Sequence, residues 1–102
     1  MNDQPNNDLR TEYVNQTQIL GGVYDFTLEF GQIEPAAQQA KIRHVAKIQM
    51  SPQHTKVLAL MLLKHIAAYE HSVGVIDLPQ ELLDNLKLSN LQHFVSQVNL
   101  NE

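Results

Sequence analysis

The chain contains no cysteine, which excludes disulfide bonds, thiolate metal ligands and cysteine nucleophiles and fits a reducing compartment. Its longest apolar run, Val57 to Leu63, is far shorter than the roughly 20 residues that cross a bilayer. The opening residues, MNDQPNNDLR, lack the basic region and apolar stretch of a secretory signal. We therefore expect a cytoplasmic protein without a membrane partner.

Positive charge is also scarce. Seven Lys and Arg residues against eleven Asp and Glu residues give a net charge of −4, so the field of the whole molecule does not attract nucleic acid. A hydrophobic fraction of 43% in 102 residues is enough for one small domain with a modest core. The Asn- and Asp-rich residues 1–11 predict a disordered N-terminal arm.

The clearest pattern in the chain is YDFTLEF, Tyr24 to Phe30, where apolar and polar residues alternate as in a half-buried strand. An earlier strand is expected over Tyr13 to Leu20, and the glycines at 21 and 22 predict a hairpin turn between the two. A loop over 31–40 and a third strand over Lys41 to Met50 follow. The sequence thus predicts an antiparallel sheet of three or more strands.

A register for the second and third strands follows from charge. Pairing Glu29 with Arg43 also sets Asp25 opposite Lys47, so that acid meets base on the outer face. On the inner face this register joins Phe26 to Ala46, Phe30 to Ile42 and Tyr24 to Ile48, and it sets His44 opposite Leu28 as a half-buried core histidine. Lys41, Arg43 and Lys47 then form a weak basic stripe on the outer face, which either follows phosphates or, as we favour, pairs with the acids.

A long helix is expected from Pro52 to about Ser72, capped by Ser51 and ended by Gly74. Its first apolar stripe, the Leu62 face, is expected to lie on the sheet; it consists of Leu58, Leu62, Ile66, Tyr69 and Val73. A second stripe, the Met61 face, consists of Val57, Leu60, Met61, Lys64 and Ala68 and leads on to His71. A solvated helix side is normally polar, so something must cover the Met61 face: the C-terminal segment or the same helix of a second copy.

The C-terminal segment, 77–102, predicts a helical extension that packs on its own or a neighbouring subunit. Asp77 is expected to cap a short helix with Pro79 in its first turn, and Ser89 to cap a further one. With the sheet and helix of 12–76, the prediction is an α+β fold: an antiparallel sheet with one long helix packed on it and short C-terminal helices.

The sequence lacks the motifs of metal binding, phosphate binding and nucleophilic catalysis. No H-x-x-x-H or H-E-x-x-H spacing predicts a zinc pair, and no glycine-rich loop opens a helix for a phosphate. Ser51 and His54 lie close in sequence, but Ser51 is expected to cap the helix, and no carboxylate is placed to orient the histidine. We therefore expect no catalytic, cofactor-binding or metal site, and no enzyme activity.

Three motifs carry a resemblance to a known family: Tyr13-x-Asn15, then Tyr-x-Phe-x-Leu-x-Phe-Gly from Tyr24 to Gly31, then Met-Ser-Pro at 50–52 before the long helix. Over Glu12 to Ile76 the chain resembles a family of short bacterial proteins of unknown function, DUF3467. The resemblance implies a small antiparallel sheet with one helix, as an oligomer in the bacterial cytoplasm, and no known activity. A fainter similarity in fold is to SecB-like chaperones.

The leading functional hypothesis is a non-catalytic interaction domain that forms a homo-oligomer, with a dimer favoured, through the Met61 face. The alternative is a SecB-like chaperone or antitoxin-type module that holds another polypeptide on exposed apolar surface. The second alternative is a nucleic-acid accessory protein that uses Lys41, Arg43 and Lys47.

Overall fold

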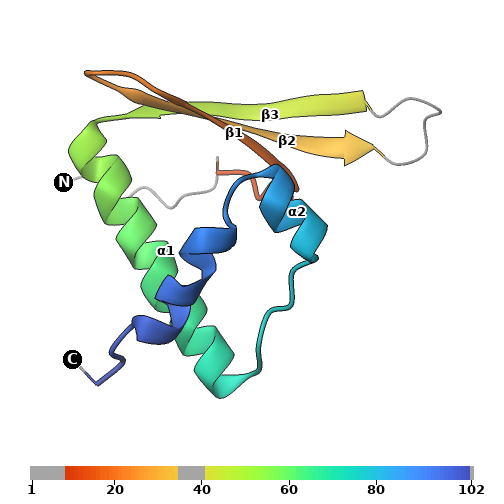
Figure 1. Cartoon of the computed structure of the whole chain (residues 1–102). Coiled ribbons are helices and arrows are strands. Elements are labelled where there is room, and N and C mark those ends of the chain that lie inside the picture. Colours follow the sequence, from red (N-terminus) through yellow and green to blue (C-terminus); the bar gives the residue numbers. More distant parts are fainter. Residues whose placement is uncertain (1–8, 35–40, 102) are drawn as a thin grey trace. The chain divides into compact units, whose positions relative to one another are not determined.

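The computed structural model describes residues 9–34 and 41–101 (Figure 1). In chain order the elements are β1 (Gln16–Gly21), β2 (Phe26–Glu34), β3 (Lys41–Met50), α1 (Pro52–Ser72), α2 (Gln80–Asn85) and the 3₁₀ helix η1 (Ser89–Gln97). The α+β class with a three-stranded antiparallel sheet, a long helix and short C-terminal helices is confirmed. The chain divides into a sheet unit, Met1–Pro52, and a helical unit, Gln53–Glu102. The predicted packing of α1 on the sheet stays a prediction, and residues 1–8 of the expected arm lie outside the described residues.

The first hairpin pairs β1 with β2 from Gln16↔Gly31 to Gly21↔Phe26. The predicted Gly-Gly turn is wrong: Gly21 belongs to β1, and the backbone N–H of Gly22 donates to the Asp25 carbonyl at 3.0 Å. Val23 and Tyr24 are therefore the turn residues, and Tyr24 is exposed rather than part of the strand. Glycine is needed at 22 because a Cβ there would lie 2.9 Å from the Asp25 carbonyl oxygen.

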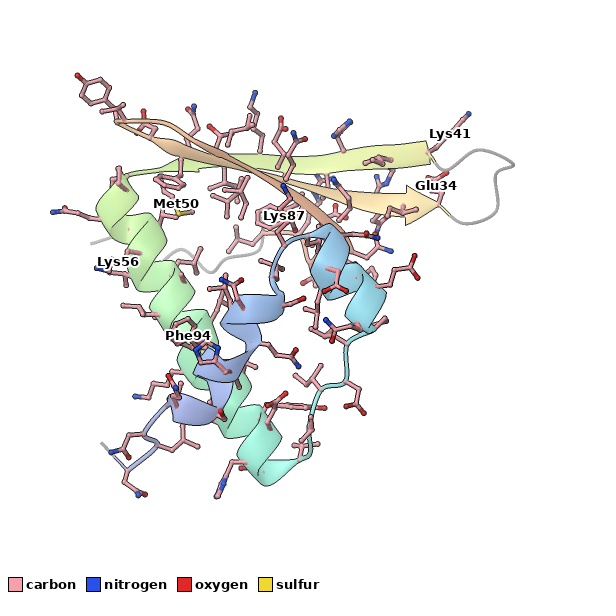
Figure 2. The ribbon with its side chains drawn as sticks, in the orientation of Figure 1. Glu34, Lys41, Met50, Lys56, Lys87 and Phe94 are labelled. Atoms are coloured by element: carbon pink, nitrogen blue, oxygen red, sulfur yellow. The ribbon has the colours of Figure 1, made fainter. Side chains whose placement is uncertain are left out.

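The predicted register of the second hairpin is wrong by four residues. Glu29 lies opposite Lys47 rather than Arg43, and Phe30 lies opposite Ala46 rather than Ile42. The physical reason is the length of β2, which continues through Gly31 to Glu34 and pairs there with Lys41, the first residue of β3 (Figure 2). The longer ladder gives more backbone hydrogen bonds than the predicted one. Residues 35–40 of the predicted loop lie outside the described residues.

A β-bulge interrupts this hairpin. Phe30 pairs with Ala46 and Gly31 pairs with His44, so Val45 is an extra residue on β3. The bulge reverses the alternation, and Ile42 and His44 lie on the opposite face from Ala46. The prediction for His44 is therefore wrong, because its side chain is opposite Gly31 and exposed.

The helical unit begins as expected. Helix α1 starts at Pro52 and ends at Ser72, and the N–H groups of Val73 and Gly74 both donate to the Tyr69 carbonyl, at 2.7 and 3.4 Å. Gly74 has φ 153°, a conformation that favours glycine.

The predicted caps of the short helices are wrong. Pro79 holds the cap position of α2 with no side-chain cap bond, so Asp77 is not the cap, and Leu88 rather than Ser89 precedes η1. The Ser89 hydroxyl instead donates to the Asp84 carboxylate, which ties the two short helices together.

Few apolar side chains are buried. Among the described residues the buried hydrophobic ones are Leu28 in β2, Ala67 in α1 and Leu83 in α2, with exposed fractions of 7%, 7% and 4%. A folded domain normally buries many more apolar side chains, because the burial of apolar surface is the main contribution that offsets the loss of chain entropy. Both units therefore expose apolar side chains that need cover.

Candidate functional site

The candidate site is the surface of α1, which carries apolar side chains on three sides. The third side, missed in the sequence, is the Ala67 face, made of Leu63, Ala67 and Glu70. Its pattern was hidden because alanine and glutamate give a weak periodic signal. A cavity of about 240 Å³ lies between this part of α1 and the C-terminal segment; its lining is Ala67, Glu70, His71, Val95, Ser96, Val98 and Leu100. Residues between Val95 and Leu100 thus share a cavity with the Ala67 face.

The Met61 face is open. Val57, Leu60 and Met61 have exposed fractions of 49%, 55% and 52%, although each is a large apolar side chain on a regular helix. Lys64 and Ala68 are also exposed. His71, at the end of this face, lines a cavity together with residues of the C-terminal segment, whereas Val57, Leu60 and Met61 in its first three turns are exposed.

The Leu62 face is also largely exposed. Leu58 is half-buried, whereas Leu62, Tyr69 and Val73 are exposed. A helix that is apolar on every side is typical of a helix buried from several directions. Ile66 on this face lines a cavity together with residues of the C-terminal segment, so the Met61 face is the more open of the two.

A larger cavity of about 830 Å³ lies in the helical unit beside the C-terminal half of α1. Its apolar lining consists of Ile66, Val75, Ile76, Leu78, Leu83, Leu88, Leu91 and Val95. The Glu70 carboxylate accepts a hydrogen bond from the Ile76 N–H at 2.9 Å and so fixes the connection after α1 at this cavity. On η1, the ring centroids of His93 and Phe94 are 4.2 Å apart. Phe94 is exposed (Figure 2). The cavity has room for several apolar side chains.

A polar cluster joins α2 to η1. The Asp84 carboxylate accepts hydrogen bonds from the Ser89 hydroxyl and from Gln80 Nε2, the latter at 2.9 Å. These two bonds hold the pKa of Asp84 below its usual value of 3.8, and the bond from Ser89 has the larger effect. The cluster contains no base that would activate the serine, so its role is structural.

The basic residues of β3 do not form one stripe. The register places Lys41 and Arg43 on one face of the sheet and Lys47 on the other, because the bulge lies between them. Lys47 Nζ lies 3.8 Å from Glu29 Oε2, and an Arg43 guanidinium nitrogen lies 3.6 Å from Glu12 Oε2. The arrangement offers no continuous cationic track for a phosphate backbone.

Residues 9–34 and 41–101 contain neither a cluster of metal ligands nor a helix fit to cross a membrane. In these ranges no three side chains from His, Cys, Asp and Glu gather as metal ligands would. Within the same part of the chain, no helix combines the length and hydropathy needed to cross a membrane.

Comparison with known proteins identifies a family. The sequence profile of a family described as "Protein of unknown function (DUF3467)" matches residues 3–78. No curated protein and no solved structure matches the chain significantly. The family match contains the three strands and α1 and ends before α2, so the two short helices lie beyond it.

Proposed function

The chain belongs to the DUF3467 family of proteins of unknown function, and we propose that it is a non-catalytic domain that self-associates through the Met61 face of α1. One observation carries the proposal: Val57, Leu60 and Met61 are about half exposed, while the C-terminal segment of the same chain lies on another side of the helix. A second copy of α1 is the cover whose chemistry matches, because it presents the same apolar side chains in return.

Lys64 sets the direction of such a contact. Parallel helices would bring the two Lys64 ammonium groups together, which like-charge repulsion disfavours. An antiparallel pair centred between Leu60 and Met61 places each Lys64 opposite Val57 of the second copy. The two lysines are then seven residues apart along the axis, about 10 Å, and each stem covers apolar surface while its charge reaches water.

The matched variants Leu60→Glu and Leu62→Glu test the proposal. Both replace a leucine of nearly equal exposure, 55% and 54%, on different sides of α1. Light scattering should give Leu60→Glu a lower mass than the parent protein, because a carboxylate would otherwise be buried without a partner, and it should give Leu62→Glu the mass of the parent protein. Circular dichroism checks that both variants are helical. If Leu60→Glu keeps the mass of the parent protein, the Met61 face is not the interface.

A second candidate function has its own observation, the apolar cavity of about 830 Å³ beside α1. In this reading the protein is a chaperone-like or antitoxin-type module that holds an apolar segment of another polypeptide there. The native protein should then bind an environment-sensitive apolar dye, and Leu91→Glu in the lining should abolish the signal while Leu60→Glu leaves it. Absence of dye binding by the parent protein would argue strongly against this candidate.

A further inference from the structure

The two edges of the sheet differ in charge. Among residues 9–34 and 41–101, the strand order β1-β2-β3 leaves β1 and β3 each with one free edge. The β3 edge carries Lys41, Arg43 and Lys47, and charged residues of this kind protect edge strands from pairing with other chains. From Tyr13 to Tyr24, a segment that contains β1, there is no charged residue and no proline. The β1 edge therefore lacks the usual protection.

The backbone groups at this edge can be identified. Gly22 N–H donates to the Asp25 carbonyl, so this pair is hydrogen-bonded in the ladder between β1 and β2. Hydrogen-bonded and non-hydrogen-bonded pairs alternate along an antiparallel ladder, so Leu20 and Gln18 also direct their N–H and C=O groups to β2. The N–H and C=O groups of Thr17, Ile19 and Gly21 therefore point outward.

The side chains of β1 fit strand pairing. Ile19 and Leu20 lie on opposite faces of the sheet and have exposed fractions of 60% and 51%. Thr17 and Ile19 are β-branched, which suits a pleated surface. Outward backbone groups, exposed apolar side chains on both faces and the absence of charge occur together on this strand alone in the described sheet.

We propose that β1 pairs in antiparallel fashion with β1 of a second copy, across a two-fold axis at Gln18, to give one continuous six-stranded sheet. In this register the outward groups of Thr17 meet those of Ile19 in the second copy, and Gln18 faces Gln18 at a non-hydrogen-bonded position. Every opposed pair from Gln16 to Leu20 is uncharged, so the strand is complementary to itself. The pairing uses a surface separate from the Met61 face of the proposed function.

A single cysteine tests the register, since the chain has none. Cα atoms at a non-hydrogen-bonded antiparallel pair lie about 4.5 Å apart, within the range of a disulfide. With added diamide, which takes up two electrons and two protons from two thiols, Gln18→Cys should form a covalent dimer at least tenfold faster than Gln49→Cys on β3. Equal rates for the two variants would overturn the proposal.

Two proline variants separate the free edge from the hairpin. In the Gln18→Cys background, Ile19→Pro removes an outward N–H and should slow cross-linking at least tenfold while circular dichroism stays unchanged. Leu20→Pro removes an N–H directed to β2 and should disrupt the hairpin itself. Cross-linking of the Ile19→Pro variant at the parent rate would contradict the proposal.

Cross-linking of Gln18→Cys is also measured in the Leu60→Glu chain, so that failure of the β1 pairing and failure of the Met61 interface give different results. The preference for Gln18→Cys over Gln49→Cys should remain there, because the β1 edge does not involve α1. Loss of that preference would show that the edge is not a separate interface. Failure of Leu60→Glu to change the mass would instead count against the Met61 face alone.

Discussion

The sheet unit and the helical unit leave different kinds of surface open. On β1 the open surface is a row of backbone N–H and C=O groups, whereas on α1 it is a set of side chains, Val57, Leu60 and Met61. A helix pairs most of its backbone N–H and C=O groups within itself. Each edge of a strand, by contrast, needs a neighbouring strand to pair these groups. A partner for β1 must therefore be a strand in register, while a partner for α1 needs only an apolar face of matching shape.

The largest effect on stability is expected in the helical unit, from Leu83→Ala. Leu83 is 4% exposed and lines the large cavity, so its truncation should lower the free energy of unfolding by about 2–4 kcal/mol. Its neighbour Leu82 is 44% exposed, and Leu82→Ala should cost less than about 1 kcal/mol. Urea unfolding followed by circular dichroism measures both. An equal loss of unfolding free energy in the two variants would show that the buried Leu83 stabilises the protein no more than the exposed Leu82.

Two glycine variants compare the units directly. In the sheet, a Cβ on Gly31 would lie 2.9 Å from Ile42 Cγ2 and 3.0 Å from the Arg43 carbonyl oxygen, so Gly31→Ala should cost about 1–3 kcal/mol through crowding at the bulge. In the helical unit, a Cβ on Gly74 meets nothing within 4 Å, so Gly74→Ala should cost about 1–3 kcal/mol through its φ of 153° alone.

Thermal unfolding measures both losses, and backbone amide shifts locate them. Gly31→Ala should move the signals of β3, whereas Gly74→Ala should leave the sheet signals in place. A stable Gly74→Ala variant would show that the end of α1 adapts without strain.

A smaller effect is expected from the ion pair across β2 and β3. Lys47 is exposed and Glu29 is half-buried, so water screens the pair, and Lys47→Ala should change the free energy of unfolding by at most about 1 kcal/mol, and less at high salt. Denaturant unfolding at low and high ionic strength measures this. A larger loss would mean that side-chain charge, rather than the backbone ladder, holds the hairpin together.

The smallest effect is a pH dependence at Asp84. The pKa of this carboxyl is below 3.8 in the folded protein because Ser89 and Gln80 donate to the charged form. Its stabilising contribution is therefore complete above the ordinary pKa and is lost as the pH falls through the lowered one. Ser89→Ala should raise the pKa of Asp84 toward 3.8 in a carboxyl NMR titration. An unchanged titration would show that the Ser89 hydroxyl does not lower the pKa of Asp84.

Sequence patterns predicted most of the elements but fewer of their contacts. The alternation of Phe26 to Phe30 and the Ser-Pro start and Gly74 end of α1 specify structure locally, and these elements are confirmed. The strand register was wrong because charge pairing of Glu29 fits Lys47 as well as Arg43, and the bulge at Val45 depends on a glycine in the opposite strand. A glycine within a strand is a local signal of such a bulge, but the alternating pattern ends at Phe30 and places Gly31 in the expected loop.

The candidate site was predictable in part. The Met61 face follows from the 3.6-residue period of α1, and its residues are exposed as a surface open to a partner requires. The side of α1 that meets the C-terminal segment was not predictable, because Leu63, Ala67 and Glu70 carry little periodic apolar signal. The free edge of β1 becomes visible only with the strand order.

The central claim is that the chain associates with itself, and the mass of the parent protein in solution tests it most directly. Light scattering over a wide concentration range should show a dimer or a larger even oligomer that persists on dilution to micromolar concentration. A mass of 11.6 kDa at every concentration, the value of one chain, would contradict both the Met61 interface and the pairing of β1.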